Sequence, residues 1–117
     1  MFGLSVLMQK TGDRFVAHCL ELDIVADAGS AEQARQELDA LVAAQIEFAV
    51  EHHNLHNLYH PAPPEFWAKF AEANSPQQAL PEWARGLELS KTMAAPPFVV
   101  TIQYVYVEAE ATSPALA

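Results

Sequence analysis

The chain of 117 residues suits one domain with a single hydrophobic core. Apolar residues make up 51% of the chain, which excludes a largely disordered protein. The formal net charge is −9 and the six Lys and Arg residues are scattered, which argues against nucleic acid as the main partner because clustered cations bind phosphate backbones. An acidic surface of this kind suits solubility or a basic protein partner.

The N-terminal part of the chain predicts a three-stranded antiparallel meander. Phe2, Leu4, Val6 and Met8 alternate with Gly3, Ser5 and Leu7, as expected for a strand. The turn-forming segment 10–13 leads into a second strand-like run at 14–20. A third, β-branched run follows at 23–27. In the second strand, one face would carry Phe15, Ala17 and Cys19, and the other Val16, His18 and Leu20.

Ser30 marks the predicted start of a long amphipathic helix that runs from about Ala31 to about Asn54. The Ser30 hydroxyl is placed to accept the Gln33 amide hydrogen while the Gln33 side chain reaches back, which is a capping box. We expect this helix to cover one face of the sheet, with Glu37, Asp39 and Glu47 largely on its other faces. The positions that recur at helical spacing are Leu38, Leu41, Val42, Gln45, Phe48 and Ala49.

Prolines then break the chain into a helical insert at about 61–95. The segment "PPEFWAKFAEA" predicts a short helix, and broken helical turns are expected around Pro76 and Pro81. The run "FVVTIQYVYVE" that begins at Phe98 predicts a long final strand. We therefore predict one α+β domain over residues 1–110, a two-layer sandwich of order β-β-β-α-(helical insert)-β with a mostly antiparallel sheet, and a flexible tail at 111–117.

The histidines of "EHHNLHNLYH" are the strongest candidates for metal ligands. His52, His56 and His60 recur every four residues, which would place three imidazoles on one helix face, where they could share a zinc ion. A metal-dependent hydrolase using these histidines is therefore an alternative function. The other interpretation is a polar helix end, where cationic histidine suits the helix dipole.

His18 and Cys19 do not form a catalytic pair in this interpretation, because neighbours on a strand point to opposite faces. Cys19 is expected in the core, while His18 could meet Glu21 or Asp23 near the strand end. No phosphate-binding loop, nucleophile elbow or C-x-x-C motif occurs, so we expect no enzymatic activity and no cofactor. The aromatic residues of the insert indicate packing, an interface or a small-ligand site.

The location of the protein is expected to be cytoplasmic. The apolar runs are too short to span a membrane, and the N-terminus lacks the basic start of a signal peptide. Cys19 is the only cysteine and has no intramolecular partner for a disulfide.

The stretch from Phe15 to Leu38 resembles the HicB-like antitoxin family. That family typically has a strand that ends in alanine and Cys-Pro-Glu-Leu, then a Gly-x-Thr helix start, Glu-Glu-Ala and a long amphipathic helix. The residues of this chain that match are Ala17, Cys19, Glu21, Leu22, Ser30, Glu32 and Ala34.

The resemblance implies a β-β-β-α-β sandwich, often called a partial ribonuclease H fold, that assembles into homodimers or higher oligomers. It also implies a non-enzymatic protein-interaction domain. Such a domain acts either as an antitoxin that binds and neutralises a small basic mRNA-cleaving toxin, or as an orphan domain of unknown function. Direct DNA binding is not expected for this chain alone, since no DNA-binding domain follows the last strand.

Oligomerisation is also expected from the sheet, because exposed edges invite pairing with another copy. One helix covers only one face of a four-stranded sheet, so either the insert or a partner must cover the other face. We expect the final strand to take part. The predicted interface residues are Trp67, Phe70, Val100, Ile102, Tyr104 and Tyr106.

Overall fold

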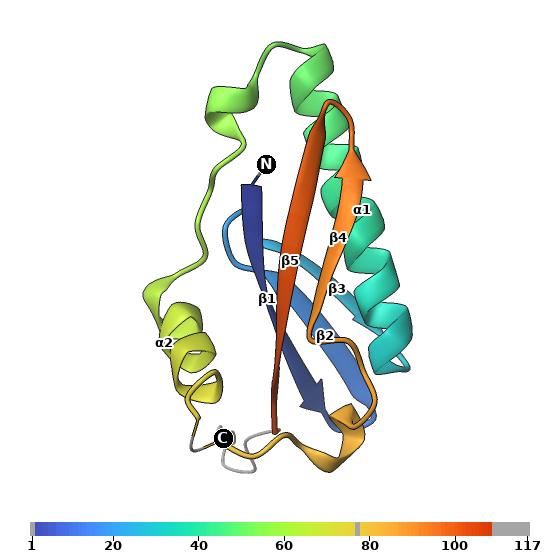
Figure 1. Cartoon of the computed structure of the whole chain (residues 1–117), viewed down its shortest axis with the longest axis vertical. Helices are drawn as coiled ribbons and strands as arrows, with labels where there is room; N and C mark the ends of the chain where they lie inside the picture. Colours follow the sequence, from blue (N-terminus) through green and yellow to red (C-terminus); the bar gives the residue numbers. More distant parts are fainter. Residues whose placement is uncertain (1, 77, 109–117) are drawn as a thin grey trace.

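The computed structural model describes residues 2–76 and 78–108 and has an α+β fold, with one long helix packed on a five-stranded sheet (Figure 1). Within this part of the chain the elements in order are β1 (Phe2–Thr11), β2 (Arg14–Cys19), β3 (Ile24–Ala28), α1 (Ala31–Glu51), the 3-10 turn η1 (Leu55–Asn57), α2 (Pro64–Ala73), the 3-10 turn η2 (Glu82–Ala84), β4 (Ser90–Ala95) and β5 (Phe98–Val107).

The strands lie side by side in the order β3-β2-β1-β5-β4. β1, β2 and β3 form the predicted antiparallel meander, in which Ala17 lies opposite both Met8 and Ala26. β5 runs parallel to β1, and β4 pairs with β5 in the antiparallel sense. The predicted α+β sandwich with a mostly antiparallel sheet is therefore confirmed.

Two predictions about the strands are corrected. The sheet has five strands rather than four, because residues 90–95 of the predicted helical insert form β4. The final strand β5 lies inside the sheet between β1 and β4, so it has no free edge to offer a partner along the length that β4 covers. The edges of the sheet are β3 and β4.

Helix α1 covers one face of the sheet, as predicted. Leu38, Val42 and Ile46 are at most 1% exposed and form the inner stripe of the helix. They pack against alternate side chains of the strands, as expected for one face of a pleated sheet. The strand residues in this core include Leu4, Val6, Met8, Ala17, Cys19, Val100, Ile102, Tyr104 and Tyr106.

The buried stripe of α1 is narrower than the predicted one. Leu41 and Phe48 are 44% and 56% exposed, and Gln45 is exposed as well, whereas Asp39 is buried. The helix packs mainly on β2 and β3, so the flank that carries Leu41 and Phe48 points past the sheet. The opposite flank carries Asp39 toward β4 and β5, where its carboxylate accepts hydrogen bonds from Lys91 and Tyr104.

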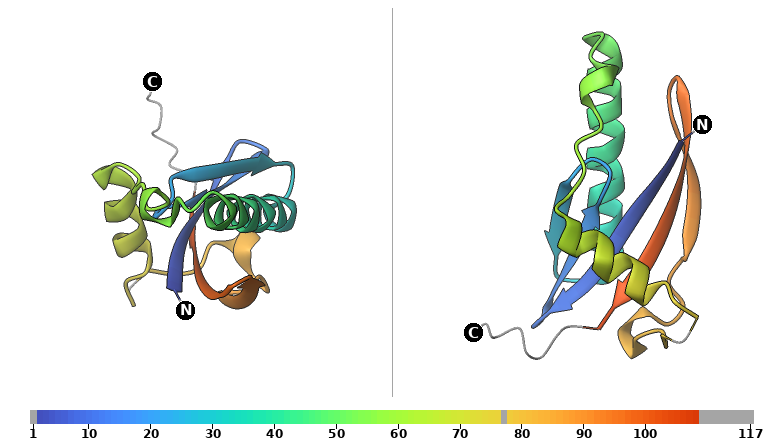
Figure 2. Two further views of the ribbon diagram at one scale, coloured as in Figure 1. Left: turned by 90° about the horizontal axis from the view of Figure 1, so that it is seen from above. Right: turned by 90° about the vertical axis from the view of Figure 1, so that its left-hand side faces the viewer.

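Helix α2 lies on the opposite face of the sheet from α1 (Figure 2). It begins with Pro64 in its first turn, as the sequence predicted. Its aromatic side chains Phe66 and Phe70 pack against Leu7 and Leu20, which point away from α1. The insert therefore covers part of the second apolar face, one of the two alternatives left open by the sequence.

The start of α1 is confirmed and its end is corrected. The Ser30 hydroxyl oxygen accepts the Gln33 backbone N–H at 3.1 Å, whereas the Gln33 side chain donates to Glu37 at 3.2 Å instead of reaching back. The helix ends at Glu51, earlier than the predicted Asn54, because His53 adopts left-handed backbone with φ of 52°.

The predicted tail at 111–117 and the last residues of the predicted domain lie outside the described residues. In residues 2–76 and 78–108, every helix is too short or too polar to cross a bilayer.

Candidate functional site

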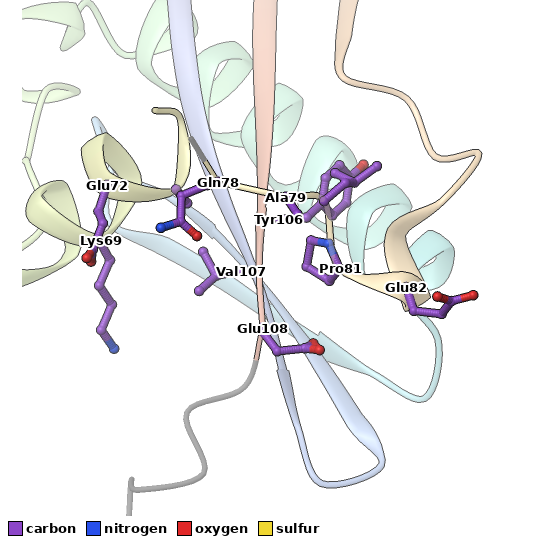
Figure 3. A pocket seen from close by; sticks show the side chains of 11 residues that line it. Lys69, Glu72, Gln78, Ala79, Pro81, Glu82, Tyr106, Val107 and Glu108 are labelled. Carbon is purple, nitrogen blue, oxygen red and sulfur yellow. The ribbon is translucent and has the colours of Figure 1, made fainter. Parts of the chain in front are cut away.

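A groove of about 420 Å³ lies where β5 ends, between α2 and the segment that leads into η2 (Figure 3). Figure 3 shows Lys69 and Glu72 of α2 on one side, Pro81 on the other and Val107 of β5 between them. Val107 packs with the aromatic side chains that dock α2 on the sheet. Packing of α2 therefore sets the shape of the groove.

Carboxylates predominate among the charged side chains that line this groove. Glu72, Glu82 and Glu108 supply three negative charges, against one positive charge from Lys69. Arg85 approaches Glu82 at 3.8 Å, but both side chains are exposed and the pair is weak. The groove therefore attracts cationic groups and repels phosphate.

A buried polar network beneath α1 was missed by the sequence analysis. Asp39 is 7% exposed and accepts hydrogen bonds from the Tyr104 hydroxyl, 3.0 Å from each carboxylate oxygen, and from Lys91 Nζ at 2.8 Å. Burial, reinforced by the Asp39 charge, raises the pKa of Tyr104 above its ordinary value. These bonds connect α1 to β4 and β5.

Arg35 extends the same network toward the loop before β4. The residue is 8% exposed, and its guanidinium lies 5.4 Å from the centre of the Tyr104 ring. Nη1 is 3.3 Å from a Glu88 carboxylate oxygen without hydrogen-bond geometry, and the Nε and Nη1 groups have no hydrogen-bond partner among the described residues. Tyr106 donates to the Glu88 carbonyl at 2.6 Å, and burial raises the pKa of Tyr106. The network orders this loop against α1.

His18 meets Asp23, one of the two carboxylates that the sequence suggested. The Nε2 atom lies 2.7 Å from Asp23 Oδ1, and His18 is 5% exposed with its ring against Phe66 of α2. Glu21 instead accepts the Ser5 backbone N–H at 2.7 Å and the Ser5 hydroxyl at 2.9 Å. Both pairs fasten the turn after β2, and α2 shields His18 from a substrate in solution.

The residues that carry the family resemblance contribute to the fold. Cys19 is fully buried, and burial raises the pKa of its thiol to about 12, so the thiol is protonated at neutral pH. Glu32 is exposed in the first turn of α1, where the helix dipole favours a carboxylate. The other core members of the signature are Ala17, Leu22 and Ala34.

The prediction that three histidines share one helix face is wrong, because His53 ends the helical path. His52 is the C-cap of α1, and His56 lies in η1. His60 lies in the following linker, where its backbone N–H donates to the Glu21 carbonyl at 2.9 Å. Over residues 2–76 and 78–108, no three His, Cys, Asp or Glu side chains are grouped so that they could hold a metal ion.

Most of the predicted interface residues belong to the core of this chain. Trp67 and Phe70 are partly buried in the contact between α2 and the sheet, and Trp67 Nε1–H donates to the Ala62 carbonyl at 3.1 Å. The other four lie beneath α1 and are at most 4% exposed, so they are not available to a second chain: Val100, Ile102, Tyr104 and Tyr106.

A second cavity, of about 370 Å³, lies at the opposite end of β1 and β5 and is lined mainly by apolar side chains. Phe2 and Phe98 meet there edge to face with ring centres 5.3 Å apart, and Tyr59 is 65% exposed. Glu21 is the one charged residue in the lining. The cavity has the apolar character of a small-ligand site. Its lining residues lie outside the aromatic insert at 61–95, where the sequence suggested such a site.

Comparisons with known proteins identify no relative of this chain. No protein-family model, no curated protein and no protein of solved structure matches it. The resemblance to the HicB-like family therefore depends on the sequence signature alone.

Proposed function

We propose that this protein is a HicB-like, non-enzymatic protein-interaction domain that binds a small basic partner. In the antitoxin version of this proposal, the partner is a basic mRNA-cleaving toxin. In the orphan version, the partner is another basic protein. The observation that carries the proposal is the acidic groove at the end of β5, where Glu72, Glu82 and Glu108 outnumber Lys69.

The burial of Cys19 and His18 supports a binding role for the protein rather than a catalytic one. Cys19 is fully buried and its thiol is protonated at neutral pH. His18 is held by Asp23 beneath Phe66, so neither side chain can act on a substrate without movement of α1 or α2.

We also propose that the chain forms a homo-oligomer in the cytoplasm. The two edge strands β3 and β4 support self-association, because each presents backbone groups that are not paired by any strand of the described residues. The free, buried Cys19 supports a reducing compartment.

The test of the basic-partner proposal is calorimetric titration with a synthetic Lys- and Arg-rich peptide at low salt. The triple variant Glu72→Gln, Glu82→Gln, Glu108→Gln should bind at least about tenfold more weakly, since up to three ion pairs worth as much as ~1 kcal/mol each are lost. The control is Glu37→Gln, Glu47→Gln, Glu51→Gln, which removes the same charge from exposed positions on α1.

The control variant should bind like the unmodified protein. Equal weakening in the two triple variants would show that only net charge matters, and the proposed groove would be rejected. The same conclusion follows if the unmodified protein does not bind the peptide.

A further inference from the structure

The outer edge of β4 is the free sheet edge with the simplest geometry for self-pairing. Lys91 lies opposite Ile102 in the β4–β5 ladder, and the Tyr104 backbone N–H donates to the Leu89 carbonyl at 2.9 Å. Hydrogen-bonded pairs alternate along an antiparallel ladder, so Lys91, like Leu89, directs its backbone groups toward β5. The intervening residues Ser90, Thr92 and Ala94 direct theirs outward.

This edge lacks the features that usually prevent strand pairing. Residues 90–95 contain no proline and no carboxylate. Lys91 is the only charge, and its ammonium is bound to Asp39 at 2.8 Å on the α1 side of the sheet. Ser90, Thr92 and Ala94 are small, uncharged and exposed.

The other edge, β3, does not suit pairing with a copy of itself. Asp27 on this strand is about half exposed, and its contact with Arg14 at 2.7 Å is equally exposed and therefore weak. Asp23, which contacts His18, directly precedes the strand in a left-handed backbone conformation. Two antiparallel copies of β3 would bring these carboxylates close together, which is unfavourable in a chain of net charge −9. Charge therefore favours β4 over β3 for self-association.

We infer that two copies of this chain pair through β4 in an antiparallel, isologous arrangement with Thr92 on the two-fold axis. In this register Thr92 lies opposite the partner's Thr92, and Ser90 lies opposite the partner's Ala94. Each such pair exchanges two backbone hydrogen bonds, since all of these groups point outward. The two five-stranded sheets then form one continuous sheet.

The same register also satisfies the side chains. Lys91 lies opposite the partner's Met93, so no like charges face each other, and Lys91 remains neutralised by its own Asp39. A Thr–Thr pair across the two-fold axis is a favourable cross-strand contact. Val99 is 45% exposed and lies beside Ala94 on the same sheet face, so it stays one strand away from the new contact.

The test is sedimentation equilibrium of the full chain at micromolar concentration. The unmodified protein should have the mass of a dimer, and Thr92→Pro should be a monomer because proline removes an outward N–H without removing any β4–β5 bond. Thr92→Lys, which leaves the backbone intact, should also be a monomer because two ammonium groups would face each other. Val99→Lys is the matched control and should remain a dimer.

A monomeric unmodified protein overturns the inference, and so does a dimer that survives both Thr92 substitutions. Circular dichroism identifies a variant that fails to fold, in which case the other Thr92 variant decides. The inference rests only on the self-association part of the proposed function. Binding of the basic peptide should be the same in Thr92→Lys as in Val99→Lys, so failure of one proposal does not affect the test of the other.

Discussion

The hydroxyl of Tyr104 lies 3.0 Å from both carboxylate oxygens of Asp39, a residue 65 positions away in the sequence. Asp39 is on the helix and Tyr104 is on the central part of the sheet, so this contact fixes how α1 sits over β5. Lys91 binds the same carboxylate and adds β4 to the arrangement.

Asp39→Ala should lower the free energy of unfolding by about 3 kcal/mol, because it leaves a buried hydroxyl and the Lys91 ammonium without their acceptor. Urea unfolding followed by circular dichroism measures this change. Glu47→Ala, an exposed change on the same helix, should alter stability by less than about 0.5 kcal/mol. Equal effects of the two substitutions would show that the buried carboxylate contributes nothing specific.

Ser30→Ala should destabilise the protein by about 1 kcal/mol, because the first-turn amide of Gln33 loses its acceptor. Ser30→Asp keeps a side-chain oxygen at the cap and should retain most of the stability. A denaturant midpoint that falls equally in both variants would contradict the capping role.

Stability should fall as the pH rises above 9.0, the ordinary pKa of a thiol. Burial raises the pKa of Cys19 to about 12, so the thiol loses its proton at lower pH in the unfolded chain than in the folded one. This deprotonation lowers the free energy of the unfolded state and therefore favours unfolding. The contribution of Cys19 to the free energy of unfolding is fully present below pH 9.0 and falls progressively toward about pH 12. The total loss amounts to about 4 kcal/mol. Tyr104 and Tyr106, whose pKa values are also raised, act in the same direction at higher pH.

Urea unfolding at several pH values measures this dependence. The decline of the unfolding free energy with pH should be shallower in Cys19→Ala, because the thiol no longer titrates in either state. Identical slopes for the two proteins would mean that Cys19 ionises normally in the folded chain.

Added zinc should leave the melting temperature unchanged, because α1 ends before His56 and His60 could join His52 on one helix face. A bound ion at about one hundred times its dissociation constant would stabilise the fold by roughly 2.7 kcal/mol, which a thermal melt detects easily. A rise in melting temperature that a chelator reverses and His56→Ala abolishes would show that these histidines hold metal after all.

Local sequence patterns predicted the elements whose formation depends on neighbouring residues. The alternating pattern of large apolar residues identified β1 and β2, and the Ser30 cap identified the start of α1. β4 was missed because its residues, "SKTMAA", have little β-propensity. That segment becomes a strand only through pairing with β5, which a local pattern cannot reveal.

Contacts between distant segments account for the other errors. Asp39 borders the apolar stripe of α1, but its burial depends on Lys91 and Tyr104, which lie 52 and 65 residues away. Leu41 and Phe48 have the right spacing for the core, yet the position of α1 on the sheet leaves them exposed. The acidic groove is assembled from three separate segments that share no sequence motif, so no signal in the sequence could have identified it.

Because β1 and β5 are neighbours in the sheet, β1 cannot complete its pairing until β5, the last of the described strands in chain order, has been synthesised. Until residues 98–107 emerge, β1 has only β2 beside it, and β4 has no neighbour at all. Asp39 of α1 likewise lacks its hydroxyl partner until Tyr104, 65 positions further along the chain, has been synthesised. The nascent chain therefore exposes the apolar surface of β1 until β5 emerges, and a chaperone that binds apolar segments would engage it during this interval.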